Sequence, residues 1–158
     1  MRRKDYELLD RNRFDEIICN ARYAHLGMVD GNMPYVIPIG FGYDMKHIYV
    51  HCASKGYKTT ILKKNPKVCV NFDSVSSVKH GTAGPCSSSL FYESVICSGE
   101  AVFVETFEEK KKALELIIKK YSPDDTREMT DKQIDQVTII RIDIDLITGK
   151  TSKKQKTN

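Results

Sequence analysis

The fold of this chain is constrained most by its short apolar runs, which follow one another at hairpin-length spacing with few helical patterns between them. We expect strands at residues 22–30, 34–43, 47–52, 67–73, 94–104 and 140–146. Asp30-Gly31-Asn32 supplies the positive φ that a tight hairpin needs between the first two runs. Consecutive strands at this spacing predict a mainly β fold, an antiparallel barrel with peripheral helices. The helices are too few and too unevenly placed for a doubly wound parallel sheet.

Three helical patterns lie between the strands. Residues 10–20 begin at a capping Asp10, residues 56–64 form a short helix, and residues 106–121 carry an apolar stripe. Thr106-x-x-Glu109 has the sequence of a capping box, and Thr130-x-x-Gln133 is expected to cap one further turn. We therefore expect six or more strands and three to four helices in a single domain spanning residues 1–150.

Two segments depart from a regular strand pattern. Pro38 removes a ladder donor inside the second run, which predicts an edge strand or a bulge there. Residues 74–91 carry serines, glycines and Pro85 and are expected to form a long loop, of the kind that is usually functional or docked on a partner. In the last strand, apolar residues alternate with charged ones, which predicts one buried and one wet face; the apolar residues are Ile140, Ile142, Ile144 and Leu146.

Composition limits the classes of function. The chain has 158 residues, and a domain of this size buries roughly 70% of its extended surface without needing disulfides or metals. The net charge of +4 comes largely from basic residues near both ends, which we expect to be solvated, including a flexible tail at 151–158. No basic stripe interleaved with aromatics runs through the body, so nucleic-acid binding is not expected.

Cysteine usage and hydropathy favour a cytoplasmic location. The five cysteines form no C-x-x-C pair and have no zinc spacing, so neither a disulfide framework nor a metal site is expected. Cys19, Cys69 and Cys97 fall in apolar runs and are expected in the core. No stretch approaches the ~20 apolar residues of a membrane span. The basic N-terminus runs into acidic residues rather than into the apolar core of a signal peptide.

Residues 49–72 are the strongest functional signal in the sequence. A β-branched run ends in His51-Cys52-Ala53, and the start of a short helix follows with Lys55, Gly56, Lys58 and Thr59. Helix N-termini offer free N–H groups and partial positive charge to an anion. Lysines in a first turn oppose the helix dipole, at a cost of up to about 1 kcal/mol unless an anion is present. We therefore predict a phosphate-binding site here, the alternative being a solvated basic helix end.

Few other residues suggest catalysis. There is no G-x-S-x-G, H-E-x-x-H, Walker A or Rossmann G-x-G-x-x-G pattern, so any chemistry is expected to be that of a cofactor. His51 either contacts a bound ligand or is an ordinary histidine at the mouth of the barrel. His25 lies in mid-strand and is expected to pack or to face solvent. The strand around Pro38 is either plain core or a source of free backbone groups for the edge of a flat heteroaromatic ring.

Short motifs follow one another in order along nearly the whole chain. They are MRRKD at the start, Pro34-Tyr35-Val36-Ile37-Pro38, Phe41-Gly42-Tyr43, Tyr49-Val50-His51, Gly56-x-Lys58, Leu62-x-x-Asn65-Pro66-x-Val68-Cys69, Tyr92-x-Ser94-Val95-Ile96, Gly99-x-Ala101, Arg141-Ile142-Asp143 and Thr148-Gly149-Lys150. Each motif is weak alone, but the ordered set is specific. Together they resemble the nitroimidazole-resistance branch of the pyridoxamine 5′-phosphate oxidase-like flavoproteins.

The resemblance implies an FMN-binding split β-barrel that works as a homodimer, with two flavins at the subunit interface. Lys58 matches a basic phosphate ligand of the broader family, and Lys55 and Thr59 lie near it. Pro38, Ile39 and Gly40 match the strand along the isoalloxazine edge. His51, Cys52 and Ala53 match the segment beside the ring and the ribityl chain. Tyr92 and Ser94 match a strand entry near the interface, which implies that the loop before them docks on the partner subunit.

The resemblance also implies a function, that of an FMN-dependent oxidoreductase. Reduced flavin would pass electrons to a small planar acceptor such as a nitro-aromatic, and a nicotinamide or another reductant would reload it. His51 matches a histidine close to the flavin and is the residue expected to contact substrate or flavin. The arginines with which the larger oxidases bind the pyridoxal substrate have no counterpart here, so pyridoxamine phosphate oxidation is not expected. The alternative is a non-catalytic module that holds FMN, haem or a deazaflavin, with His51 or His25 as an axial ligand to haem.

Overall fold

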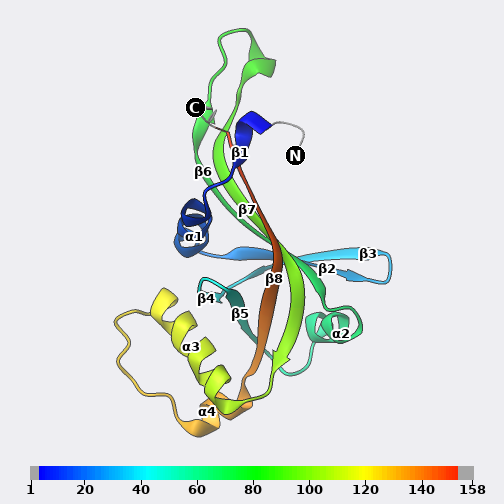
Figure 1. The fold of residues 1–158 in the computed structure, drawn as a ribbon, viewed down its shortest axis with the longest axis vertical. Coiled ribbons are helices and arrows are strands. Elements are labelled where there is room, and N and C mark those ends of the chain that lie inside the picture. The colour runs from blue at the N-terminus through cyan, green and yellow to red at the C-terminus, as the bar shows by residue number, and fades with distance from the viewer. Residues whose placement is uncertain (1–3, 153–158) are drawn as a thin grey trace.

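The computed structural model describes residues 4–152, so the basic residues expected at the extreme ends lie outside the described residues. Within this range the chain forms one eight-stranded antiparallel sheet with four α-helices around it (Figure 1). The strand order is β3-β2-β6-β7-β8-β5-β4, with β1 paired to β8. The two end strands of this order do not pair with each other, so the barrel is split. The predicted mainly β split barrel is confirmed.

The strands are β1 (Glu7–Leu8), β2 (Ala24–Asp30), β3 (Met33–Ile39), β4 (Gly42–Tyr43), β5 (His47–Cys52), β6 (Lys67–Lys79), β7 (Ser89–Val104) and β8 (Thr138–Thr151). The helices are α1 (Arg11–Asn20), α2 (Tyr57–Lys64), α3 (Phe107–Tyr121) and α4 (Asp131–Gln136). Among the residues described, no helix combines the length and the apolar character needed to cross a membrane.

The long loop expected at 74–91 is instead the end of a β-hairpin. β6 continues to Lys79 and pairs with β7, which already begins at Ser89. This arm, residues 73–92, projects beyond the rest of the sheet (Figure 1). A register shift between Val75 and Ser77 interrupts the alternation of apolar and polar residues. The run of serines therefore concealed a strand, because the bulge removes the period of two on which strand prediction rests.

The core fills the inside of the coiled sheet. Every second residue of the central strands is buried there, and α1 closes one side with Phe14, Ile17 and Ile18. A second, smaller cluster lies where α3 packs on the sheet, and consists of Tyr49, Val104, Ala113 and Ile139. Each large side chain that is fully buried in these clusters contributes about 1.5–3 kcal/mol of transfer free energy.

The last strand changes face partway along its length. Ile140 and Ile142 are fully buried as expected, but Leu146 is 59% exposed. The register passes from Gly99↔Ile144 to Ser98↔Leu146, so one residue of β8 has no partner on β7. Such a bulge reverses the alternation beyond it, and Leu146 consequently lies on the outer face of the sheet. The expectation that this residue is buried was wrong.

The edge position predicted for the strand containing Pro38 is confirmed, since β3 ends the strand order. Its ladder with β2 runs from Ala24↔Ile39 to Asp30↔Met33 without a register shift, so Pro38 does not mark a bulge. Alternate residues face outward, and Val36 among them is 61% exposed. Pro34 and Pro38 are both accommodated because their missing N–H groups fall on the open side of the edge strand.

Cysteine burial follows strand geometry rather than local hydropathy. Cys97 is buried as expected, but Cys19 and Cys69 are exposed. Cys69 alternates with the buried Val68 and Val70, so its side chain leaves β6 on the opposite face. The expected core placement was therefore wrong for two of the three cysteines.

The two predicted capping boxes differ in outcome. Thr130 and Gln133 cap α4 reciprocally, as expected. Thr106 makes no side-chain capping bond, and Glu109 instead accepts a hydrogen bond of 2.8 Å from Arg141. At the other end of the sheet, Ser152 N donates to the carbonyl of Tyr92.

Candidate functional site

The predicted phosphate site forms where β5 ends and α2 begins. Gly56 is the N-cap residue, with φ of 153° and no side-chain capping bond. The first backbone bond of the helix is donated by Thr60 to Gly56 O at 3.1 Å. The N–H groups of Tyr57, Lys58 and Thr59 thus find no acceptor among residues 4–152. Three unpaired donors at a helix start are suited to the oxygens of a phosphate.

Two lysines, Lys55 and Lys58, belong to the same short segment as these donors. Lys58 is half-buried and lies close enough to Cys52 for its charge to act on the thiol: burial raises the pKa of Cys52, and Lys58 opposes that rise. Lys55 is exposed. Neither ammonium forms a hydrogen bond or an ion pair within the described part of the chain, which leaves both available to an anion. Thr59 is only 4% exposed, and its hydroxyl donates to Gly56 O at 2.8 Å, so it closes the helix start from inside.

The predicted site residues His51, Cys52 and Ala53, at and just after the end of β5, do not share one face of the strand. Cys52 packs against the barrel core, whereas the preceding His51 is exposed and pairs in register with Ile139. Because successive side chains of a strand point to opposite faces, His51 and Cys52 do not face one ligand from the same side. Cys52 therefore shares its surroundings with Lys58. Ala53 follows the strand and is exposed.

The predicted ring-edge residues lie at the end of β3. Ile39 is 5% exposed and belongs to the core, while Pro38 is exposed on the opposite face. Gly40 is exposed, and a Cβ on it would lie 3.6 Å from the Tyr121 ring. The Tyr121 hydroxyl accepts a bond from Phe41 N at 3.1 Å and donates to Arg22 O at 2.9 Å. The strand end is thus held in place from α3.

Tyr92 and Ser94 lie far from the helix start. Tyr92 is bonded to Ser152 at the base of the arm, and the Lys150 ammonium lies 5.6 Å from the centre of its ring. Cys52 of β5 lies near the opposite end of β7. It pairs with Thr138 of β8, and the next residue of β8 pairs with Val104, the last residue of β7. From Tyr92 to Val104 the strand covers roughly 40 Å at about 3.3 Å per residue. Tyr92 and Ser94 therefore do not lie near Lys58 of the same chain.

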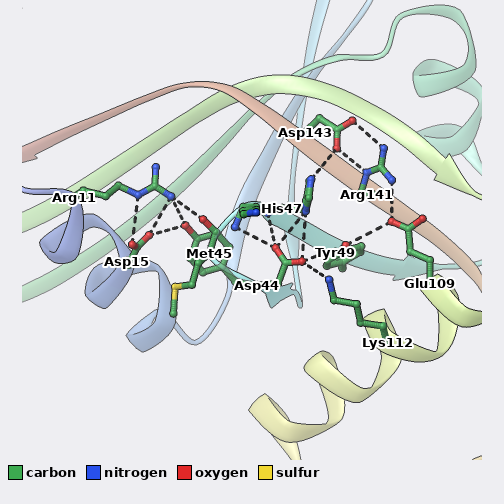
Figure 2. Close-up of polar contacts among 12 residues, drawn as sticks. Arg11, Asp15, Asp44, Met45, His47, Tyr49, Glu109, Lys112, Arg141 and Asp143 are labelled. Atoms are coloured by element: carbon green, nitrogen blue, oxygen red, sulfur yellow. Dashed lines mark hydrogen bonds and ion pairs between the residues drawn. The ribbon is translucent and has the colours of Figure 1, made fainter.

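A polar network between α3 and the sheet had no signal in the sequence (Figure 2). Asp44 accepts bonds from Lys112 Nζ at 2.6 Å and from His47 N at 2.7 Å, although its side chain is only 12% exposed. Burial alone would raise the pKa of Asp44, but these donors outweigh it and hold the pKa well below the usual aspartate range. Tyr49 OH lies 3.4 Å from the same carboxylate.

The network continues across β8. Arg141 donates to both oxygens of Asp143 at 2.6 and 3.0 Å, and to Glu109 of α3 at 2.8 Å. His47 lies between the two halves, with Nδ1 3.3 Å from Asp44 and Nε2 3.8 Å from Asp143 (Figure 2). The bonds from Lys112 to Asp44 and from Arg141 to Glu109 join residues far apart in the chain, so no local pattern could have predicted them. They fix the start of β5, the strand whose end carries His51 and Cys52.

A cavity in another part of the structure does not include the predicted site residues. A cavity of about 450 Å³ lies between α3 and residues 122–130, and its lining mixes lysines, acids and Pro123. The described residues contain no group of three or more His, Cys, Asp or Glu side chains arranged to hold a metal ion. The helix start at Lys58 is instead an open surface, whose free donors and positive charge suit a phosphate group.

The fold and this surface define a class of protein, and comparison with known families agrees. The family model described as pyridoxamine 5′-phosphate oxidase matches residues 10–151, and the chain belongs to this family. No curated protein matched the chain.

Among solved structures, one similar protein is a candidate 5-nitroimidazole antibiotic resistance protein from Bacteroides thetaiotaomicron. It is 32% identical, with 91% of this chain and 85% of that chain covered and a TM-score of 0.81. The likeness places this chain in the nitroimidazole-resistance-like branch of the family.

Two more distant structures share the fold. A FAD- and haem-binding protein from Mycobacterium smegmatis is 20% identical, with 97% and 76% of the two chains covered and a TM-score of 0.85. A flavocytochrome from Azotobacter vinelandii is 17% identical, with 97% and 72% covered and a TM-score of 0.83.

Proposed function

We propose that this protein is an FMN-dependent oxidoreductase that reduces a small planar acceptor, such as a nitro-aromatic compound. The observation that carries the proposal is the start of α2, where uncapped N–H groups and two unpaired lysines meet in a chain of this family. A phosphate there would satisfy the donors and offset the repulsion between the lysines and the helix dipole. The similar protein from Bacteroides supports a nitro compound as the acceptor.

The residues predicted for the site have separate parts in this proposal. Lys58, with Lys55 beside it, would bind the phosphate, and Cys52 and Ala53 would lie along the ribityl chain. Pro38 and Gly40 would line the ring edge, with Ile39 anchoring their strand in the core. His51 would contact substrate or flavin from the exposed face. A bound flavin would supply the redox chemistry, with electrons from a nicotinamide or another donor.

The protein would act as a homodimer. Tyr92 and Ser94 lie at the opposite end of the sheet from Lys58, so a second copy is needed to place them beside the same ligand. The surface available for pairing is apolar: Val75, Val78 and Leu90 of the arm are each more than 40% exposed, as is Leu146. Exposed apolar surface of this kind marks interaction sites, and stable dimers bury more than about 1,000 Å². Sedimentation of the flavin-loaded protein as a monomer at micromolar concentration would exclude this assembly.

Flavin binding is tested by replacing Lys58 and comparing two ligands. Lys58→Ala is expected to weaken FMN binding about 10- to 100-fold, because a charge-assisted hydrogen bond contributes about 1.5–3 kcal/mol. Binding of riboflavin, which has no phosphate, should be unchanged. Lys119→Ala is the matched control, since it removes the same charge from an exposed position on α3. Quenching of flavin fluorescence measures the affinities of the wild type and both variants for the two ligands.

Three results would refute the proposal. The first is a colourless purified protein that fails to bind FMN at tens of micromolar. The second is equal FMN affinity in the Lys58 and Lys119 variants. The third is a loss of riboflavin affinity as large as the loss of FMN affinity, which would indicate a general structural effect.

A non-catalytic binding module is the second candidate function. It is favoured by the two structural neighbours whose names include haem or cytochrome. The visible spectrum of the purified protein separates the candidates, because haem gives one intense, narrow Soret band and flavin gives two weaker, broad bands, one on each side of that wavelength. A Soret band that shifts on replacement of His51 or His25 would favour haem ligation.

A further inference from the structure

His25 of β2 lies directly beside the predicted ring-edge strand. It pairs with Pro38 of β3 on one side and with Asn71 of β6 on the other. Directly opposite residues in an antiparallel pair place their side chains on the same face. His25 and Pro38 therefore share the outer face of the sheet.

The His25 imidazole is oriented by two neighbours. Its Nδ1 lies 3.7 Å from an oxygen of Asp73, and the Tyr23 ring meets it edge-on, with ring centres 5.4 Å apart and planes at 83°. Asp73 is itself held by Asn71 Nδ2 at 2.8 Å. With the carboxylate beside Nδ1, Nε2 is the ring nitrogen left to face a ligand.

The surface around His25 is open and partly apolar. Gly27 follows on the same face between Val36 and Cys69, and a Cβ there would lie 3.3 Å from Cys69 O, so the strands approach closely and the face stays flat beside His25. Val36 is 61% exposed. The His25 side chain is 39% exposed, so water can restore a proton that it gives away. These features suit a flat ring lying near the imidazole rather than a histidine held within the core.

We propose that His25 is a catalytic residue of this protein, the proton donor to the acceptor, with Asp73 as its positioning residue. The inference rests on the proposed function and deepens it. Reduction of an aromatic nitro group to nitroso consumes two electrons and two protons and releases one water. A bound reduced flavin would supply both electrons and one proton. His25 Nε2 delivers the other proton to a nitro oxygen, the N–O bond breaks, and solvent reprotonates the imidazole.

The test compares two oxidants of the chemically reduced, flavin-loaded protein. A nitroimidazole needs a proton when it accepts electrons, whereas ferricyanide takes electrons alone. His25→Gln is expected to slow reoxidation by the nitroimidazole about 100-fold or more, the usual contribution of a general acid. Reoxidation by ferricyanide and the affinity for FMN should stay within about threefold of the wild type. Asp73→Asn should slow only the nitroimidazole reaction, and by less.

His80→Gln, at the tip of the arm, is the matched control and should behave as the wild type.

Each outcome of this test decides the inference. A His25→Gln rate within threefold of the wild type, or equal slowing with both oxidants, overturns the role of His25 and leaves the oxidoreductase intact. A wild-type protein that binds no flavin, or whose reduced flavin does not react with the nitroimidazole, overturns the proposed function and the role of His25 with it.

Discussion

Replacement of Asp44 offers the sharpest test of how α3 is held on the sheet. The carboxylate bonds Lys112 Nζ at 2.6 Å and the backbone N–H groups of His47 and Lys46 at 2.7 and 3.1 Å. Hydrogen bonds to a charged group contribute about 1.5–3 kcal/mol each, less where water can replace the partner. Lys112 is 53% exposed, so its ion pair contributes under about 1 kcal/mol. The two backbone bonds hold the tight turn in which Met45 has φ of 69°.

These magnitudes predict an order of effects. Asp44→Ala should lower the free energy of unfolding by about 2–4 kcal/mol, because it removes all three bonds and leaves the turn unsupported. Asp44→Asn should cost about 1–2 kcal/mol, since the amide oxygen can still accept from the turn. Lys112→Ala should cost less than about 1 kcal/mol. Urea denaturation followed by circular dichroism measures all three.

The effect of Asp44 should also depend on pH with a definite sign. The folded-state pKa of Asp44 is depressed below that of a free aspartate, about 3.9. Its stabilisation is therefore complete above the unfolded value and is lost as pH falls through that value toward the folded pKa. The difference between wild type and Asp44→Asn should shrink below about pH 4. Equal stabilities at pH 7, or a difference that does not change in acid, would refute the role assigned to the carboxylate.

Two other substitutions test how the ends of α3 and β3 fit together. Tyr121→Phe leaves Phe41 N without its acceptor, at a cost of about 1 kcal/mol, and should lower the melting temperature by about 2–4 °C; an unchanged melting temperature would mean that water replaces the hydroxyl. Gly42→Ala places a Cβ 2.8 Å from Leu116 Cβ and should cost about 1–3 kcal/mol in chemical denaturation, because α3 must shift; a variant as stable as the wild type would contradict this fit.

The elements that local chemistry specifies could be predicted from the sequence. The helices begin within a residue of their expected starts, since Asp10 and Thr130 act as caps. The strand at 47–52 has the predicted bounds, because a turn and a helix start flank it. Where a tertiary partner decides, sequence reasoning failed. Glu109 has the sequence of a capping residue, but Arg141 binds it instead.

The candidate site divides in the same way. The lysines and the helix start at residues 55–59 could be predicted, because their signal is contained in one short segment. His25 was expected to pack, to face solvent or to ligate haem, and its place beside Pro38 and Asp73 could not be predicted, because these neighbours come from two other strands. The bulge that exposes Leu146 left no trace in the alternating pattern of β8, because that pattern continues unbroken through it.

The prolines of the outermost strand bear on how this protein avoids aggregation. Strand β3 leaves one side of its backbone unpaired, and such a side normally invites another chain to add a strand. Pro34 and Pro38 offer no donor there, so a second molecule cannot extend the sheet along this side without breaking its hydrogen bonding. Fibril-like stacking of one sheet edge on another is thereby disfavoured, and self-association is expected through the faces of the sheet rather than through this edge.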